Sequence, residues 1–170
     1  MASPRSIGAV CKEIQLVDGQ LLRPWGKADA AVLVDAWNDP EIQRWNPVPD
    51  NPTLDLARTW IAGTDAQTEQ SNGIDVVLVD EAGQIAGEIG LQVDRERRLG
   101  EVGFWLTSNH RGSGYGRSLL AAANALRVEL GLIGLVAMVD AKNGPALGLL
   151  ASCDWTELET TSDRRAFAVR

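Results

Sequence analysis

Hydrophobic positions recur at helical spacing through the first third of the chain. Apolar residues three and four positions apart predict a helix over 29–37, and a second short helix is predicted over 40–45. Prolines then exclude regular structure until Thr53, a typical N-cap, from which we predict a helix over 53–70. The segment 14–25, before these helices, is predicted to be extended with a tight turn.

The middle of the chain changes to the pattern of β-strands. Strands are predicted over 75–79, 84–93 and 99–106, where β-branched residues and alternation replace the helical spacing. A hairpin turn over 81–83 and a charged loop over 94–98 connect them. These segments are therefore expected to be consecutive strands of one sheet.

The last third of the chain alternates helices and strands. The predicted elements are helices over 114–130 and 145–152, an apolar strand over 132–139, and closing strands over 155–159 and 166–169. A run of strands followed by such alternation is typical of a mixed α/β sheet covered by helices. With 170 residues, the chain is expected to form a single domain, 1–170.

Acidic side chains are concentrated in the middle of the chain. Residues 39–98 contain 12 acidic and 5 basic residues, a net charge of −7 that equals the net charge of the whole chain. A nucleic-acid backbone requires a basic surface, so nucleic acid is excluded as the main partner. The charge is compatible with a cationic partner such as an amine, and equally with an acidic surface that only aids solubility.

Other features of the composition exclude further classes of protein. The sequence has neither a signal-peptide pattern nor a run of about 20 apolar residues, so a cytoplasmic protein without a membrane span is expected. One histidine and two distant cysteines, Cys11 and Cys153, cannot build a usual metal site, and both thiols are expected to be reduced. The oligomeric state stays open, a homodimer included.

The glycine-rich segment 106–117 is the part of the sequence most informative about chemistry. It joins a predicted strand to a long helix, so loop amides and the positive end of the helix dipole converge on one spot. Its three glycines let a phosphate approach the main chain, and Arg111 and Arg117 can pair with phosphate oxygens. The segment has neither the lysine of a Walker loop nor the dinucleotide-binding spacing, and a plain strand-to-helix turn is the alternative.

The spacing Arg111-x-x-Gly114-x-Gly116 resembles the R/Q-x-x-G-x-G/A signature with which GNAT acetyltransferases bind coenzyme A. The strand 100–106 before the loop is similar to the family's strand, and 140–155 is similar to its asparagine-plus-helix segment. The resemblance covers nearly the whole chain. It implies a GNAT fold, with a mixed sheet of about six to seven strands, flanking helices and a splayed strand pair that holds the coenzyme.

Three N-terminal segments narrow the resemblance to one branch of this family. Segments 22–25, 37–42 and 57–61 are similar to those of the RimJ/RimL-like branch, which acetylates the N-termini of ribosomal proteins. This similarity is less specific about the acceptor than the loop is about the coenzyme.

The resemblance implies acetyl-CoA as co-substrate. The main chain around Phe104 and Leu106 would pair with the pantetheine amides, and Asn143 stands where the family commonly places an asparagine that meets the pantetheine arm. A helix N-cap is an alternative or additional role for Asn143. The residues expected to hold the pyrophosphate are Arg111, Gly112, Ser113, Gly114, Tyr115, Gly116 and Arg117.

Acetyl transfer to an amine needs a group that takes a proton from the protonated amine. Glu101 is the first candidate, because strand alternation places it on one face of the coenzyme-binding strand, near the expected thioester. Glu88 on the neighbouring strand is the second, and either could instead be a solvated strand charge. His110 is expected to be a turn residue rather than the base.

The proton donor for the leaving thiolate is less clearly marked. Many family members have a tyrosine in the last helix, but Leu150 stands at the matching position here. Ser152 is the candidate side chain, with water as the alternative, while Cys153 is expected to belong to the core.

The expected reaction is direct transfer of the acetyl group from acetyl-CoA to a primary amine in a ternary complex, because no nucleophile is poised by a base. The acceptor is expected to be a cationic small amine or a peptide N-terminus. Asp39, Glu41, Asp50 and Asp55 are expected to attract it. The alternative is a coenzyme A-binding sensor or scaffold with little activity. The family's tyrosine is missing, and Ala146 stands where many members have a serine three residues after the asparagine.

Overall fold

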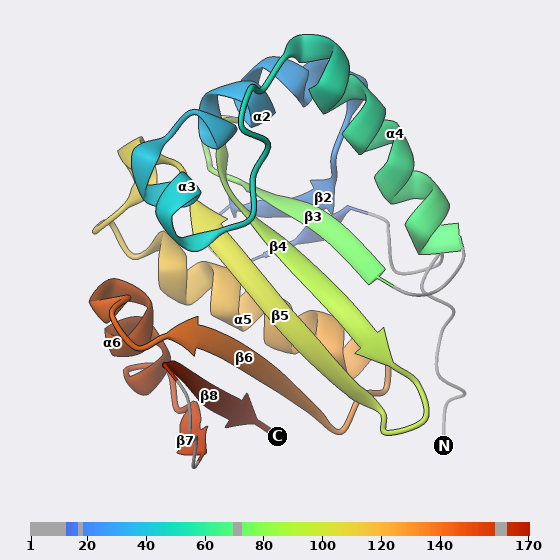
Figure 1. Ribbon diagram of the computed structural model, residues 1–170. Coiled ribbons are helices and arrows are strands. Elements are labelled where there is room, and N and C mark those ends of the chain that lie inside the picture. Colours follow the sequence, from blue (N-terminus) through green and yellow to red (C-terminus); the bar gives the residue numbers. More distant parts are fainter. Residues whose placement is uncertain (1–12, 17–18, 70–72, 159–162) are drawn as a thin grey trace.

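The computed structural model describes residues 13–16, 19–69, 73–158 and 163–170. These residues form one eight-stranded sheet in the order β1-β2-β3-β4-β5-β6-β8-β7 (Figure 1). The strands are β1 (Ile14–Gln15), β2 (Leu21–Pro24), β3 (Gly73–Val79), β4 (Ile85–Asp94), β5 (Leu99–Leu106), β6 (Gly134–Asp140), β7 (Thr156–Leu158) and β8 (Arg164–Val169). The mixed α/β sheet is confirmed, with a two-residue strand, β1, raising the number of strands above the six to seven expected.

The helices cover both faces of this sheet. They are α2 (Ala30–Trp37), α3 (Pro40–Trp45), α4 (Leu54–Glu69), α5 (Tyr115–Glu129) and α6 (Gly144–Ala151), with the short 3-10 helices η2 (Lys27–Asp29) and η3 (Ser108–His110). In Figure 1, α2 and α4 lie on one side of the strands and α5 on the other. The predicted helices are thus all present, with ends that differ by a few residues.

Polar residues cap the starts of α4 and α3, and the sequence predicts the first of these caps, Thr53. The Thr53 hydroxyl oxygen accepts a hydrogen bond from the Leu56 N–H at 3.2 Å before α4. The Asp39 carboxylate accepts one from the Glu41 N–H at 2.9 Å at the start of α3, where Pro40 needs no partner for a missing N–H. These caps satisfy main-chain donors that the first turn of a helix leaves free.

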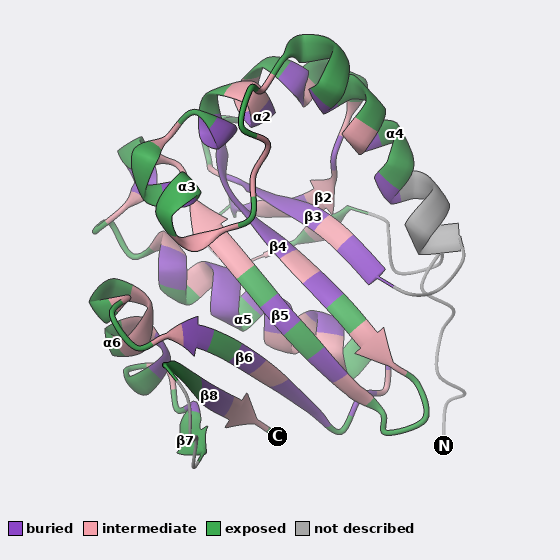
Figure 2. Ribbon diagram, in the orientation of Figure 1, coloured by how far each residue is buried: buried purple, intermediate pink, exposed green. Residues whose placement is uncertain are grey.

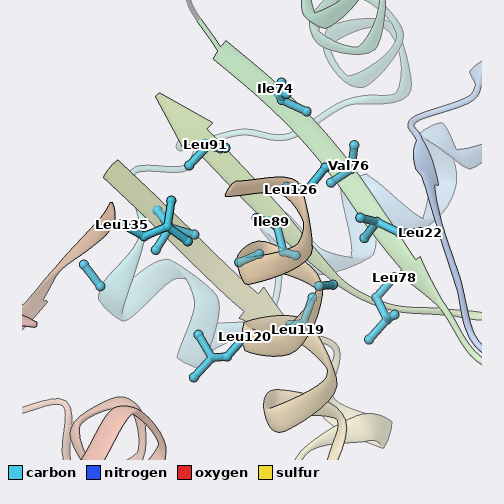
Figure 3. Close-up of a cluster of buried hydrophobic side chains, with 14 of the residues drawn as sticks. Leu22, Ile74, Val76, Leu78, Ile89, Leu91, Leu119, Leu120, Leu126 and Leu135 are labelled. Carbon is cyan, nitrogen blue, oxygen red and sulfur yellow. The ribbon is translucent and has the colours of Figure 1, made fainter. Parts of the chain in front are cut away.

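Two hydrophobic clusters hold the helices against the sheet. The larger one lies between the sheet and α5, where side chains of β3, β4 and α5 meet, including Leu78, Ile89 and Leu119 (Figure 3). The second lies under α2 and α4 and includes Trp25, Leu33, Ala57, Ile61 and Val77. Purple, buried segments on the strands in Figure 2 mark where the sheet meets these helices. The middle strands are therefore anchored from both sides.

The pairing of β5 differs sharply between its two neighbours. Against β4 it is antiparallel along its whole length, from Leu99 opposite Asp94 to Leu106 opposite Gly87. Against β6 it is parallel and pairs only through Leu99, Gly100 and Glu101. Beyond Glu101 the two strands separate, which confirms the splayed strand pair that the resemblance implies.

Candidate active site

A cavity of about 650 Å3 lies where β5 and β6 separate. Its walls are residues 102–106 of β5, residues 137–140 of β6, parts of the glycine-rich loop, residues along α6 from Asn143 to Ser152, and α3 with Asn46. The site is thus made by segments that are far apart in sequence and that the splayed strands bring together.

The cavity reaches both faces of the sheet. Val102 and Phe104 pack with the α5-side cluster, whereas Trp105 packs with the cluster under α2 and α4, and all three line the cavity. Leu149 of α6 borders it on one side and Trp45 of α3 on the other. A ligand bound at the glycine-rich loop can therefore extend through the gap toward α3.

The glycine-rich loop has the main-chain conformation of an anion site. Gly112 and Gly114 have φ values of +73° and +91°, a left-handed region that favours glycine, and Gly114 is the residue before α5. Among the described residues, no hydrogen-bond acceptor meets the N–H groups of Gly112, Ser113 and Gly114. These amides and the N-terminus of α5 can therefore bind a phosphate.

Side chains around the loop have distinct surroundings. Gly116 packs so closely on α6 that a Cβ atom there would lie 2.8 Å from Leu149 Cδ2. Tyr115 turns its hydroxyl to Glu81, to which it donates a hydrogen bond at 2.8 Å, and neither Tyr115 nor Ser113 lines the cavity. The contacts predicted for these two residues are those of their main-chain amides, and they stay a prediction.

The two loop arginines play different parts. Arg117 lines the cavity, is exposed, and makes one long hydrogen bond of 3.4 Å to the Ser152 carbonyl, so its charge can turn to a phosphate. Arg111 also lines the cavity, but its guanidinium donates to the Leu106 carbonyl at 2.9 Å and to the Asp39 carboxylate at 2.6 Å. The expected pairing of the Arg111 side chain with phosphate therefore competes with partners inside the protein.

Asn143 lies at the N-terminus of α6 and lines the cavity with Phe104 and Leu106. Its side-chain oxygen accepts a hydrogen bond from the Ala146 N–H at 3.2 Å, which confirms the N-cap role. A contact with the pantetheine arm stays a prediction, and the position in the cavity wall is compatible with both roles.

The two candidate bases lie on the same face of the sheet, outside the residues that line the cavity. Glu101 is exposed and occupies the last pair that β5 makes with β6. Glu88 lies opposite Trp105 on β4 and is only 9% exposed. Both carboxyl groups share the face on which Trp105 borders the cavity, because residues 101, 103 and 105 alternate with the α5-facing positions.

Burial changes the protonation of Glu88 and of a nearby aspartate. Desolvation, with the neighbouring charge of Asp75, raises the pKa of Glu88 to about 8, although the indoles of Trp25 and Trp105 oppose the shift. Trp25 Nε1 is buried and lies near this carboxyl, but it completes no hydrogen bond with an acceptor among the described residues. Burial also raises the pKa of Asp75 to about 6. Glu88 therefore holds a proton at neutral pH.

The residues at and near the family's proton-donor position differ in their surroundings. Leu150 is fully buried in the core. The Ser152 hydroxyl donates to the Leu149 carbonyl at 2.8 Å, beside Arg117 at the loop end of the cavity. Cys153 is half-buried and packs against the core, while Cys11 lies outside the described residues. Ser152 lines the cavity, and its role as a donor to the thiolate stays a prediction.

His110 is buried and belongs to a network behind the loop. One ring nitrogen, Nδ1, lies 2.7 Å from the Thr107 hydroxyl and the other, Nε2, lies 2.9 Å from the Asp80 carboxylate. Desolvation opposes the shift, but hydrogen bonds from His110 and from main-chain N–H groups hold the pKa of Asp80 below its usual value. His110 does not line the cavity, which agrees with a structural role at the turn.

The resemblance placed Glu41 on the acceptor side, but the sequence did not show that Ile42, Trp45 and Asn46 also line the cavity. Glu41, Ile42, Trp45 and Asn46 form one side of the cavity. The Asp39-Pro40 pair predicts where this helix begins, but no local pattern shows that the helix lies over the distant strand β5. The contact between Asp39 and Arg111 spans 72 positions, and only the fold reveals it.

Comparisons with known proteins agree with this geometry. Residues 20–156 match the family described as acetyltransferase (GNAT) domain. The Bacillus licheniformis protein named "Uncharacterized N-acetyltransferase p20" is 28% identical over 140 residues, which are 77% of this chain and 75% of that protein. Solved structures with the same fold include the ribosomal-protein-S5-alanine acetyltransferase of Vibrio fischeri, with a TM-score of 0.78, 16% identity, and coverage of 93% of this chain and 96% of that one.

Another structure with this fold was solved with its ligands. Spermidine N-acetyltransferase of Vibrio cholerae, in complex with CoA and spermine, has a TM-score of 0.76 and 16% identity, and covers 89% of this chain and 95% of that one.

The chain thus belongs to the GNAT acetyltransferases, and it is an acyltransferase that uses acetyl-CoA as co-substrate. The alternative of a sensor or scaffold without transfer has no support in these comparisons. Among the described residues, no cluster of histidine, cysteine or acidic side chains could hold a metal ion. No helix in the same part of the chain is long and apolar enough to cross a membrane.

Proposed function

We propose that this acetyltransferase acetylates a cationic primary amine, by direct attack of the amine on acetyl-CoA in a ternary complex. The observation that carries the proposal is the cavity between β5 and β6, which joins the anion-binding loop to the α3 side of the sheet. A coenzyme held at the loop can present its thioester through the gap, and the amine can approach from α3. Holding both reactants in one cavity replaces a collision in solution by an oriented encounter.

Glu101 is the proposed proton acceptor for the amine. It is exposed on the face that carries Trp105, at the point where β5 and β6 separate, so an incoming amine can reach it directly or through water. Glu88 shares this face but is buried, and its raised pKa of about 8 leaves it protonated at neutral pH. Glu88 is therefore the second candidate, one that would act only when it loses its proton.

The charge of the α3 side supports a cationic acceptor, but fewer carboxylates contribute to it than the sequence suggests. Glu41 is exposed and lines the cavity, and its only ion pair among the described residues is a long one of 4.0 Å to Arg44. Asp39 is instead bound to Arg111, Asp55 pairs with Arg58 at 3.1 Å, and Asp50 lies outside the cavity wall. Of the four carboxylates, Asp39 is therefore the least suited to attract the acceptor, because its charge is already paired with Arg111.

Two classes of acceptor fit such a site. A peptide N-terminus ranks first, because the N-terminal segments resemble the RimJ/RimL-like branch and the Vibrio fischeri relative in fold is a ribosomal-protein acetyltransferase. A small polyamine ranks second, since the Vibrio cholerae relative in fold is a spermidine N-acetyltransferase. A cytoplasmic location belongs to the same proposal.

Thiol release from acetyl-CoA tests the proposal. The protein is assayed with an alanine-first peptide that carries two lysines, with spermidine, and with N-terminally blocked peptide as control. We expect release with at least one free amine and a mass gain of one acetyl group in that acceptor. Binding of acetyl-CoA without release across all amines would refute the proposed reaction. Trapping of an acetylated protein side chain during turnover would refute direct attack.

A further inference from the structure

One guanidinium connects the coenzyme strand to the helix on the acceptor side. Arg111 Nε and Nη2 donate to the Leu106 carbonyl, at the end of β5, at 3.2 and 2.9 Å. Nη2 also donates to Asp39 Oδ2 at 2.6 Å, in an ion pair whose side chains are 35% and 14% exposed. The contact is therefore partly shielded from water, where such a charge-assisted bond is stronger than at the surface.

Asp39 sits at the start of α3, and its two oxygens have separate tasks. Oδ1 caps the helix by accepting from the Glu41 N–H, while Oδ2 accepts from Arg111. Desolvation opposes the shift, but the hydrogen bonds from Arg111 and Glu41 hold the pKa of Asp39 below its usual value. The carboxylate is thus charged at neutral pH and fixes the first turn of α3 against the loop.

The position of α3 decides the shape of one side of the cavity. Its residues Glu41, Ile42 and Trp45 line the cavity opposite α6. The indole N–H of Trp45 donates to Glu41 at 3.3 Å, so these two side chains move together with the helix. A shift of the helix N-terminus would therefore change the acceptor side of the cavity and leave the loop amides in place.

We propose that Arg111 is a positioning residue, which holds α3 against the end of β5 so that the acceptor meets the coenzyme in a fixed geometry. In this proposal the main-chain amides of the loop and Arg117 bind the phosphates, and the side chain of Arg111 serves the acceptor side. The inference rests on the proposed use of the α3 side by the amine. It assigns a different task to each arginine of a motif whose two arginines look equivalent in the sequence.

The test separates coenzyme binding from acceptor use. Arg111→Gln and Asp39→Asn remove the bridge from either end, and asparagine keeps the helix cap because it is as good an N-cap as aspartate. Both variants should raise the KM of the alanine-first, two-lysine peptide about tenfold and change the Kd of acetyl-CoA by less than about threefold. Arg117→Gln should do the reverse. The double variant Arg111→Gln/Asp39→Asn should be no worse than either single variant, because both remove the same contact.

Arg23→Gln is the matched control. Arg23 binds Asp29 at the same 2.6 Å, with exposures of 23% and 14%, and Asp29 likewise accepts a main-chain N–H, from Gly26. Arg23 does not line the cavity, so its loss should lower stability to a similar degree without changing either constant. A rise of the peptide KM in Arg23→Gln equal to that in Arg111→Gln would attribute the effect to general loosening and overturn the proposal.

Hydrogen exchange supplies a readout that does not depend on the acceptor. Amides of α3 should exchange faster in Arg111→Gln and Asp39→Asn than in the parent or in Arg23→Gln. If exchange in α3 responds and no amine is turned over, the bridge stands and the proposed reaction fails. If Arg111→Gln weakens acetyl-CoA binding as much as Arg117→Gln and α3 exchange is unchanged, Arg111 is a phosphate ligand and the proposal is wrong.

Discussion

Glu88 and Trp105 lie directly opposite each other in the β4–β5 ladder, and only Trp105 touches the cavity. The Glu88 carboxyl is buried on β4, whereas Glu101, which precedes Trp105 by four residues on β5, is exposed. Two carboxyl groups on one face of the sheet thus have opposite environments, and environment decides which of them is charged at neutral pH.

The first prediction separates the two carboxylates by kinetics. Glu101→Gln should lower kcat about 100-fold and leave the Kd of acetyl-CoA within about twofold, because the amide cannot take the proton of the amine. The measurement is a pair of assays, thiol release at saturation and calorimetric titration of acetyl-CoA. If Glu88→Gln shows this pattern instead, and kcat/KM of the parent rises with pH until about 8, the base is Glu88.

The second prediction concerns stability and pH. In the folded state Glu88 has a pKa of about 8 and stays protonated below that pH. In the unfolded chain its pKa is the ordinary value of 4.5, so the proton is lost near that pH. Between these values the folded state binds more protons, so stability should fall as pH rises from 5 to 8. Replacement by glutamine removes this contribution. The Tm of Glu88→Gln minus that of the parent should therefore increase by about 4 °C or more between pH 5 and pH 8.

Thermal unfolding at four pH values checks this prediction, and Glu96→Gln serves as its control because Glu96 is exposed. Asp75→Asn should produce a shift of the same sign at lower pH, since burial raises the pKa of Asp75 to about 6. A difference in Tm that stays constant across the series for Glu88→Gln would show that the carboxyl is solvated in the folded protein.

The third prediction concerns the glycine-rich loop. Gly114→Val should weaken acetyl-CoA binding at least about tenfold, because a φ of +91° is strained for any β-branched residue and the loop must rearrange. No atom lies within 4 Å of a Cβ at this position, so backbone strain and not a clash is the cause. Gly63→Ala, in exposed surroundings on α4, is the control for a change at a glycine. A folded Gly114→Val protein that binds acetyl-CoA as tightly as the parent would show that the loop is not the phosphate-binding site.

The fourth prediction concerns attraction of the acceptor by Glu41. Added salt should raise the KM of a cationic peptide and affect kcat less, because exposed charges are screened beyond roughly 8 Å at physiological ionic strength. Glu41→Gln should raise KM at low salt and flatten the salt dependence. The control is Asp55→Asn, whose carboxylate pairs with Arg58 and lies outside the cavity wall. A flat salt series with the parent would favour an acidic surface that only aids solubility.

Local patterns predicted the elements and their order along the chain. The strand over 99–106 has the predicted bounds, and Thr53 and Asn143 cap the helices as expected. Such features depend on neighbours in sequence, namely alternation, a capping side chain and a proline, and each can be recognised without the fold.

Contacts across long stretches of sequence could not be predicted in this way. The sequence offered Arg111 as a phosphate ligand and Asp39 as a surface charge, but each is the other's partner. The sequence offered Glu88 as a second candidate base or as an exposed hairpin residue, and did not show its burial, which depends on Trp25 and Trp105 from other elements. In each case the side chain's role is set by a neighbour that only the tertiary fold supplies.

The three-residue pairing of β5 with β6 leaves main-chain donors and acceptors of both strands facing the gap beyond Glu101. A coenzyme that forms hydrogen bonds with these groups would link β5 to β6, so its binding would also stabilise the contact between these two strands. At a concentration 100 times its Kd, such a ligand adds about 2.7 kcal/mol to the free energy of unfolding. The resistance of this protein to unfolding and proteolysis would then rise and fall with the concentration of acetyl-CoA. The coenzyme would take the place of a strand that is present only when it is bound.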